Sequence, residues 1–274
     1  MMRVYLEGIG LFGPGLEDWA KGRAVLAGRA DYMPVPLPLP PPALLPANER
    51  RRAPAIVKLA LATCTEAFAA AGRDPATLAA VFTSSGGDGD TIHEILGTLA
   101  SAQRELSPTR FHNSVHNTAA GYWSIATGAK AATTSLCCHD GSFAAGLLEA
   151  AVQAAESGTA VVLAAYDAPY PAPLAAARPI SAMFGAALLL TPVPAAASFA
   201  RIDLALHPGT HLPTPCVEAG LEALRRSVPA ARGLPLLAAL AGGGAAGMVL
   251  EYLPGLALWL DVAPRPAAGW KDAS

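Results

Sequence analysis

Two adjacent cysteines, Cys137 and Cys138, are the residues best suited to covalent chemistry in this sequence. They follow a short strand pattern and precede a run, 142–156, that is typical of a buried helix. A cysteine at such a turn lies near the positive N-terminal end of the helix, which favours thiolate over thiol. Since a thiolate attacks thioesters, the turn indicates a site that accepts an acyl group. The alternative is that Cys137 is a small residue buried at a tight turn.

Histidines and an aspartate lie close to these cysteines. His139 and Asp140 either pair with each other or leave Asp140 to cap the following helix, and we favour capping. His112 and His116 are four residues apart, a spacing that can place two imidazoles on one helix face for metal binding. The sequence shows no third ligand, so we expect no metal there and favour a role at an interface or a helix start.

Composition limits the class of protein. The chain has 274 residues, enough for one large domain or two small ones. It is 53% apolar and only 15% charged, which indicates either a large apolar interface with another subunit or simply a high alanine content. With a net charge of −2, the chain gives no indication of binding to nucleic acid or to an anionic membrane.

The cysteines and the apolar runs indicate a cytoplasmic protein without a membrane span. The four cysteines are Cys64, Cys137, Cys138 and Cys216. They show neither paired metal-ligand spacing nor a disulfide framework, so we expect reduced thiols and no bound cofactor. We see no signal peptide at the N-terminus. The uncharged run 234–250 is interrupted by Pro235 and by glycines at 242–244, so we predict two strands around a glycine turn.

The elements that position these residues alternate between strands and helices. The residue patterns predict strands over 4–12, 78–83, 159–165 and 199–206, and helices over 19–26, 54–71, 142–156 and 218–227. A further strand over 182–191 and a helix over 91–99 are implied by the family resemblance described below. The uncharged strand 159–165 is typical of a parallel sheet covered on both faces. Seven prolines in 34–46 predict an extended arm, either a linker or a docking site for a partner. The whole pattern indicates an α/β layered fold.

The central stretch resembles the N-terminal half of a β-ketoacyl synthase, a condensing enzyme of the thiolase superfamily. That family has a helix with an Asn-x-x-Ala-Gly-like start and then a strand ending in Thr-Ala-Cys-Ser-Ser-Gly. Here the corresponding segments are 117–121 (Asn-Thr-Ala-Ala-Gly) and 134–140 (Thr-Ser-Leu-Cys-Cys-His-Asp). The resemblance places Cys137 in the position of the acyl-accepting nucleophile, or Cys138 if the register shifts by one. After Cys137 the family has small residues and glycine, which this chain lacks.

The resemblance covers residues 1–195 and implies a second, shortened part. A complete ketosynthase has two related halves, and the second half supplies two catalytic histidines. The run from His207 to His211 looks like a catalytic His-Gly-Thr-Gly-Thr motif but better matches an earlier His-x-Thr-Ala-Pro segment of the family. We therefore expect a thiolase-like α/β/α fold that is essentially one half of a ketosynthase. Residues 196–274 would be a truncated remnant of the second half that completes the sheet.

The expected loss of most of the second half, with its two catalytic histidines, directs the functional prediction. Histidine donors stabilise the enolate and oxyanion of decarboxylative condensation, and one oxyanion donor is worth roughly 10²–10³ in rate. The favoured prediction is a non-catalytic chain-length-factor-like partner of a full-length ketosynthase, similar to the short subunits of aryl polyene and type II polyketide systems. It would form a heterodimer, help to shape the acyl tunnel and meet acyl carrier protein with its acyl or polyene intermediates. The alternative is an acyltransferase that uses Cys137, and a third possibility is a decayed stand-alone protein of this superfamily.

Overall fold

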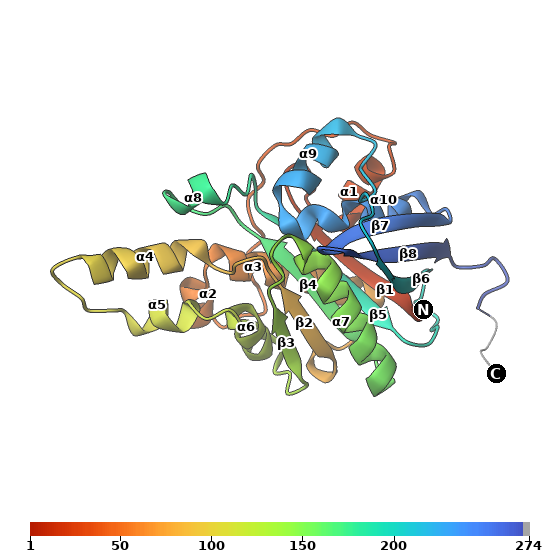
Figure 1. Cartoon of the computed structure of the whole chain (residues 1–274). Coiled ribbons are helices and arrows are strands. Elements are labelled where there is room, and N and C mark those ends of the chain that lie inside the picture. The colour runs from red at the N-terminus through yellow and green to blue at the C-terminus, as the bar shows by residue number, and fades with distance from the viewer. Residues whose placement is uncertain (271–274) are drawn as a thin grey trace.

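The computed structural model describes residues 1–270 of the chain, and within them eight strands form one sheet (Figure 1). The strands are β1 (Met2–Phe12), β2 (Ala79–Thr83), β3 (Thr133–Leu136), β4 (Val161–Asp167), β5 (Phe184–Thr191), β6 (Ala200–Pro208), β7 (Ala246–Leu253) and β8 (Leu256–Pro264). They lie in the order β3-β2-β4-β5-β1-β6-β8-β7. β2 is parallel to β3 and β4, and the other neighbouring pairs are antiparallel. The sheet is therefore mixed. The expected parallel sheet is wrong where β4 pairs with β5, because that pair is antiparallel.

Helices cover both faces of this sheet. The helices are α1 (Trp19–Leu26), α2 (Ala47–Arg52), α3 (Ala55–Ala71), α4 (Gly89–Ala100), α5 (Pro108–Asn113), α6 (Thr118–Thr127), α7 (Ser142–Ser157), α8 (Leu174–Ala177), α9 (Ala219–Ser227) and α10 (Leu234–Gly242), with 3-10 turns η1 (Pro75–Thr77), η2 (His139–Gly141) and η3 (Pro229–Gly233). α3 and α6 pack on one face, and α7, α1 and α10 pack on the other. The predicted α/β/α layering is confirmed.

The layering follows from the alternation of side chains along the strands. Val81 and Leu163 lie in the core beneath α7, whereas their neighbours Phe82 and Ala164 lie in the core beneath α3. Successive residues of a strand point to opposite faces, so a strand that is apolar at every position must be covered on both sides. This is why β4 reads as an uninterrupted apolar run from Val161 to Tyr166.

Two glycines in β1 allow α3 to lie unusually close to the sheet. A Cβ atom added to Gly10 would lie 1.9 Å from the carbonyl oxygen of Thr63, and one added to Gly8 would lie 2.0 Å from that of Ala67. Both obstacles are backbone atoms, which cannot rotate away. These two positions therefore fix the spacing between α3 and β1.

One sequence-based expectation about the second part of the chain is wrong. Residues 234–242 form helix α10 instead of a strand, and a single strand, β7, follows. Pro235 lies in the first turn, where the missing N–H is not needed by the helix. The rest of the run is rich in leucine and alanine, both good helix formers, and Gly243 ends it with φ of 71°. The proline therefore marks the start of a helix and not a break between strands.

The C-terminal part of the chain continues the same sheet. β6 pairs with β1, from Met2↔Leu204 to Leu6↔Ala200, and β8 and β7 follow outward from β6. The division of the chain at residue 195 stays a prediction. Among residues 1–270, no helix combines the length and apolar character needed to cross a membrane.

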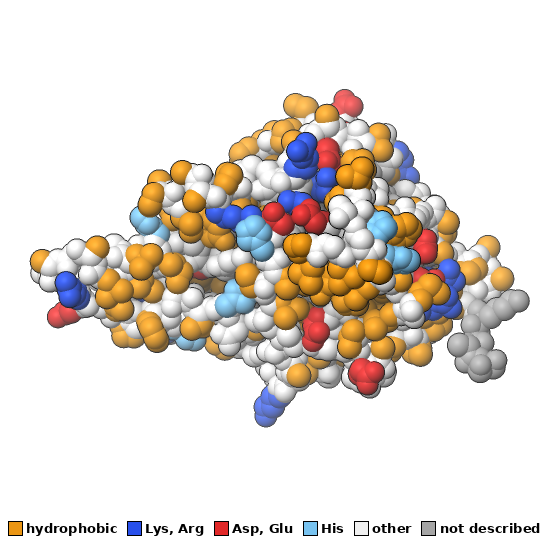
Figure 2. Space-filling view, viewed as in Figure 1, with side chains coloured by type: hydrophobic (Ala, Val, Ile, Leu, Met, Phe, Trp, Pro, Cys, Tyr) orange, Lys and Arg blue, Asp and Glu red, His pale blue; other side chains and the backbone are white. Residues whose placement is uncertain are grey.

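α4 and α5 form an arm that projects from the body of the molecule (Figure 1). Apolar side chains are exposed along this arm (Figure 2), and others are exposed in the segment between α5 and α6 and on α6 itself. We call this the apolar arm surface; it consists of Ile92, Leu96, Leu99, Phe111, Val115 and Ile125. Leu96 is 59% exposed and Phe111 is 63% exposed, so the isolated chain leaves the surface uncovered.

The proline-rich segment 34–46 has neither helix nor strand, as its composition predicts. It runs along the outside of the core, and Leu45 is buried while Leu37 and Leu39 are partly buried against the layer of α3. A role of this segment in docking a partner stays a prediction.

Candidate functional site

Cys137 lies at the end of β3, on the loop that leads into η2 and α7. Its side chain is exposed, and Sγ donates a hydrogen bond to the carbonyl oxygen of Ser85 at 3.0 Å. This contact joins the Cys137 loop to the segment that follows β2. The strand, turn and helix that the sequence predicts around Cys137 are present.

Helix α7 begins at Ser142, as the sequence predicts, and a 3-10 turn lies between it and the two cysteines. η2 (His139–Gly141) separates the cysteines from α7, which begins at Ser142 after Gly141 as its N-cap. The expected capping by Asp140 is wrong, because no side chain caps α7. Ser142 instead joins the turn to the helix: its Oγ donates to the carbonyl oxygen of His139 at 2.7 Å and accepts from the N–H of Cys138 at 3.1 Å. His139 has φ of 50°, an unusual conformation for a non-glycine residue.

Cys138 is less accessible than Cys137. Burial raises the pKa of its thiol, and the neighbouring Cys137 raises that pKa further. Cys138 is therefore a poor thiolate source. Cys64 is fully buried, which also raises the pKa of its thiol and agrees with the inert role expected from its helical spacing.

Asp140 is the centre of a cluster of charges beside the two cysteines. Its carboxylate lies 2.7 Å from Arg178 and 3.3 Å from Arg232, and Arg232 also pairs with Glu251 of β7. The pairing of His139 with Asp140, the other interpretation of the sequence, is present at 3.7 Å. The cluster ties the cysteine turn to the segment after β4, to η3 and to β7. These long-range partners explain why Asp140 does not cap α7.

The pKa of Asp140 is lowered, and this sets a pH dependence. Burial alone would raise that pKa, but the hydrogen bond from Arg178 and the charge of Arg232 outweigh burial. A carboxyl group whose pKa is lower in the folded state than in the unfolded state stabilises the fold when it is ionised. This stabilisation is complete at pH values above the ordinary carboxyl pKa, and it is lost as the pH falls through the lowered pKa.

We therefore expect Asp140→Asn to lower the free energy of unfolding by about 1 kcal/mol at neutral pH, because two cations lose their shared partner. The difference from the unmodified chain should shrink toward pH values of about 3. Urea denaturation of both chains across this pH range measures the effect. Asp31→Asn is the matched control, since Asp31 is exposed and outside the cluster. A loss that is the same at every pH would contradict this account.

Asp167, which the sequence analysis did not single out, lies behind the carbonyl that contacts Cys137. It is buried at the end of β4 and accepts hydrogen bonds from Ser84 Oγ at 3.0 Å, from Ser85 N and Oγ at 2.8 Å each, and from Ala230 N at 2.8 Å. Burial raises its pKa, while the hydrogen bonds from Ser85 and Ser84 oppose this. Asp167 thereby fixes the turn that presents the Ser85 carbonyl. Neighbouring parallel strands end at the same edge of a sheet. The polar residues Ser84, just after β2, and Asp167, at the end of β4, were therefore the sequence signal that could have predicted this contact.

Cys137 opens onto a groove of about 870 Å³. Its lining includes Cys137 and Cys138, His211 and Leu212, and the turn between β7 and β8. His211 does not pair with either cysteine: its Nε2 lies 3.1 Å from the carbonyl oxygen of Pro208. His207 packs on Trp259 with ring centroids 4.7 Å apart. Within residues 1–270, no histidine forms a hydrogen bond with Cys137, so the nucleophile–base pair of covalent catalysis is absent there.

His112 and His116, whose spacing could place both on one helix face, do not lie in the same helix. His112 lies in α5, whereas His116 lies beyond it and its Nε2 is 2.8 Å from the carbonyl oxygen of Leu136. In the described part of the chain, no three His, Cys, Asp or Glu side chains are grouped so that they could hold a metal ion. His116 instead supports the end of β3, next to Cys137.

Comparison with known proteins places this chain in a family. Residues 19–214 match the family described as "Beta-ketoacyl synthase, N-terminal domain". The chain belongs to this family, as the resemblance around Cys137 implies. No curated protein sequence matches the chain.

Solved structures with the same fold include complexes of ketosynthases. A ketosynthase (ApeO) in complex with its chain length factor (ApeC) from Xenorhabdus doucetiae is 20% identical with a TM-score of 0.71, covering 95% of this chain and 100% of the matched chain. The ishigamide ketosynthase/chain length factor is 16% identical with a TM-score of 0.72, covering 96% and 99%. The complex AntDE:AntF, a type II polyketide synthase acyl carrier protein with its ketosynthase, is 10% identical with a TM-score of 0.73, covering 96% and 99%. These similarities show a thiolase-like ketosynthase fold over nearly the whole chain.

Proposed function

We propose that this chain is a chain-length-factor-like partner of a full-length ketosynthase and does not itself catalyse condensation. The observation that carries the proposal is the apolar arm surface, which the isolated chain leaves in solvent. Two of the similar structures are described as complexes of a ketosynthase with a chain length factor, which makes a ketosynthase the partner that best fits this surface. Exposed apolar patches on a protein surface mark sites of interaction with other proteins.

The edge of the sheet beside the arm supports the same partner. β3 follows α6 in the chain and is the edge strand on its side of the sheet; among residues 1–270 it pairs only with β2. At the opposite edge, Thr214 exchanges two hydrogen bonds with Val249 of β7, each of 2.9 Å, so that edge is partly covered. An open edge can continue its ladder with a strand of another chain. The heterodimer that we propose would cover β3 and the apolar arm surface together.

The state of Cys137 supports a non-catalytic role. Its thiol donates to a carbonyl, and no histidine forms a hydrogen bond with it in the described residues. In the heterodimer, the groove beside Cys137 would shape the space for the growing acyl chain and meet acyl carrier protein. We propose aryl polyene or type II polyketide synthesis as the setting of this complex. The free cysteines of the chain suit the reducing cytoplasm, where we propose that it acts.

We expect Cys137→Ala to leave both the complex and product formation intact, because this role needs no acyl transfer to sulfur. The measurement is product yield from the purified ketosynthase complex with acyl carrier protein, comparing the variant with the unmodified chain. Loss of product from a complex that still forms would contradict the proposal.

A second candidate function is acyl transfer through Cys137, which the exposed thiol and its groove favour. The intact mass of the chain after incubation with acyl-loaded carrier protein distinguishes the two. An added acyl mass that is absent from Cys137→Ala would support the enzyme. We expect no added mass and alkylation of Cys137 by iodoacetamide no faster than that of a free cysteine.

A further inference from the structure

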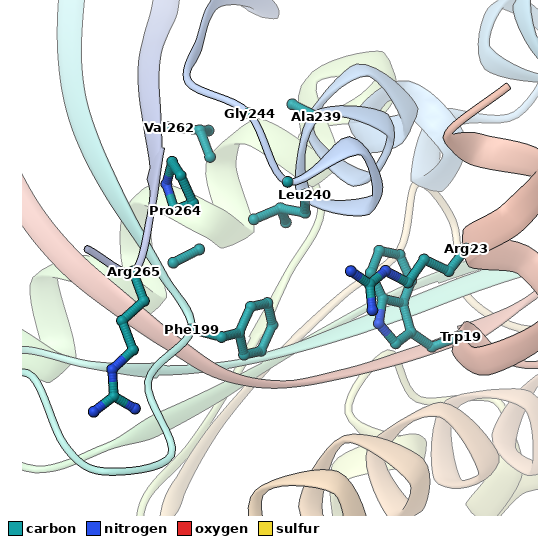
Figure 3. Close-up of a pocket in the computed structure, with 11 residues that line it drawn as sticks. Trp19, Arg23, Phe199, Ala239, Leu240, Gly244, Val262, Pro264 and Arg265 are labelled. Atoms are coloured by element: carbon teal, nitrogen blue, oxygen red, sulfur yellow. The ribbon is translucent and has the colours of Figure 1, made fainter. Parts of the chain in front are cut away.

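A second cavity lies at the other end of β8 from the Cys137 groove. β8 begins at Leu256 beside the groove and ends at Pro264 beside this cavity, which has a volume of about 340 Å³. Apolar side chains from four elements form its walls (Figure 3). They include Trp19, Phe199, Leu240 and Val262. A cavity of this size and lining is in the usual range for a small organic ligand.

Two arginines stand at this cavity. Arg23 extends with Trp19 from α1 toward Phe199 and Leu240, whereas Arg265 stands at the opposite margin (Figure 3). Arg23 Nε lies 3.5 Å from the carbonyl oxygen of Ala241, and Arg265 donates to that of Ala196 at 2.7 Å. Both contacts leave further guanidinium N–H groups for a ligand.

Neither guanidinium has a carboxylate partner within residues 1–270. The two acidic residues at the start of α1, Glu17 and Asp18, are 2.6 and 3.9 Å from Lys21 instead. An apolar cavity with two such cations complements a ligand that has an apolar body and one anionic end.

We infer that this cavity binds a medium-chain carboxylic acid, with the alkyl chain against Trp19, Phe199 and Leu240 and the carboxylate on Arg23. The planar guanidinium presents parallel N–H groups that match the two oxygens of a carboxylate. Arg265 would add positive potential at the far margin. This site is separate from the Cys137 groove and does not depend on the proposed partnership with a ketosynthase.

Isothermal titration with a series of eight-carbon probes tests the inference on the full chain. We expect octanoate to bind at least about tenfold more tightly than octanol or octylamine, which share its tail but lack the carboxylate. Acetate, which lacks the tail, should show no measurable binding. Equal affinity for octanoate and octanol would overturn the role of Arg23, and binding of acetate would overturn the role of the apolar walls.

Variants locate the site. Arg23→Met should weaken octanoate binding at least about tenfold. Arg29→Met is the matched control, since Arg29 donates to the same carbonyl of Ala241 at 3.4 Å but does not line the cavity. Ala239→Phe adds a ring to the cavity wall and should abolish binding. Octanoate binding that survives Ala239→Phe, or that Arg29→Met weakens as much as Arg23→Met does, would overturn the inference. These variants should leave binding to a ketosynthase unchanged, so the two proposals fail separately.

Discussion

A chain carrying Leu96→Asp and Phe111→Asp is expected to fold normally and to bind a full-length ketosynthase at least about 100-fold more weakly. Both side chains are more than half exposed on the apolar arm surface, so the substitutions remove no core packing in the isolated chain. In the proposed heterodimer they would place two carboxylates in an apolar interface, where an unpaired charge is strongly unfavourable.

The control for this experiment adds the same charge elsewhere on the surface. Val193 is 60% exposed between β5 and β6, and Val217 is fully exposed before α9. Val193→Asp with Val217→Asp should leave ketosynthase binding unchanged. Surface-immobilised ketosynthase titrated with each purified chain gives the dissociation constants, and circular dichroism checks the fold. Equal affinity of the arm variant and the unmodified chain would remove the apolar arm surface from the interface.

Arg73→Met is expected to lower the free energy of unfolding by about 2 kcal/mol, because the Glu7 carboxylate is buried whereas the Arg73 side chain is 41% exposed and partly screened by solvent. Glu7 is buried in β1, and both of its oxygens accept hydrogen bonds of 2.8 Å from Arg73, just beyond the end of α3. Glu7 also lies at the β-bulge where the register of β1 against β5 shifts. A bulge changes the direction in which a strand side chain points. Removing only the cation leaves a buried carboxylate without its partner.

The matched variant removes both charges. Glu7→Met combined with Arg73→Met should recover most of the lost stability, because apolar side chains of similar volume can replace a buried ion pair. Denaturant midpoints for the single and double variants, at equal slopes of the unfolding transition, measure the recovery. A double variant as unstable as Arg73→Met alone would show that the pair contributes by something other than charge compensation.

The sequence predicted the fold better than it predicted the site. Apolar runs located β1, β2, β4 and β6 and the long helices α3 and α7, because strands and helices covered by a core carry a periodic pattern. Pro235 predicted a break between strands, but a proline in the first turn of a helix is compatible with the helix, and α10 begins there. The mixed character of the sheet depends on pairing between distant segments, which no local pattern contains.

The surroundings of Cys137 depend on such distant pairings. The strand, turn and cysteine were predicted, but the sequence gives no sign that Ser85 would accept the thiol hydrogen bond. The ion pairs of Asp140 come from Arg178 and Arg232, which the topology brings to one edge. Local rules favoured a helix cap for Asp140 because they describe only neighbours in the sequence. The geometry that decides between a reactive and an unreactive cysteine is therefore tertiary.

The position of β1 in the centre of the sheet has a consequence for how the chain folds during synthesis. β1 precedes the other strands of this sheet in the chain, yet its two neighbours begin at Phe184 and Ala200. Until those segments emerge, β1 is an apolar strand with both edges unpaired, the kind of segment that associates wrongly with other chains. The sheet has high contact order and closes late, which slows folding. The nascent chain is therefore expected to need chaperone protection until β6 has been made.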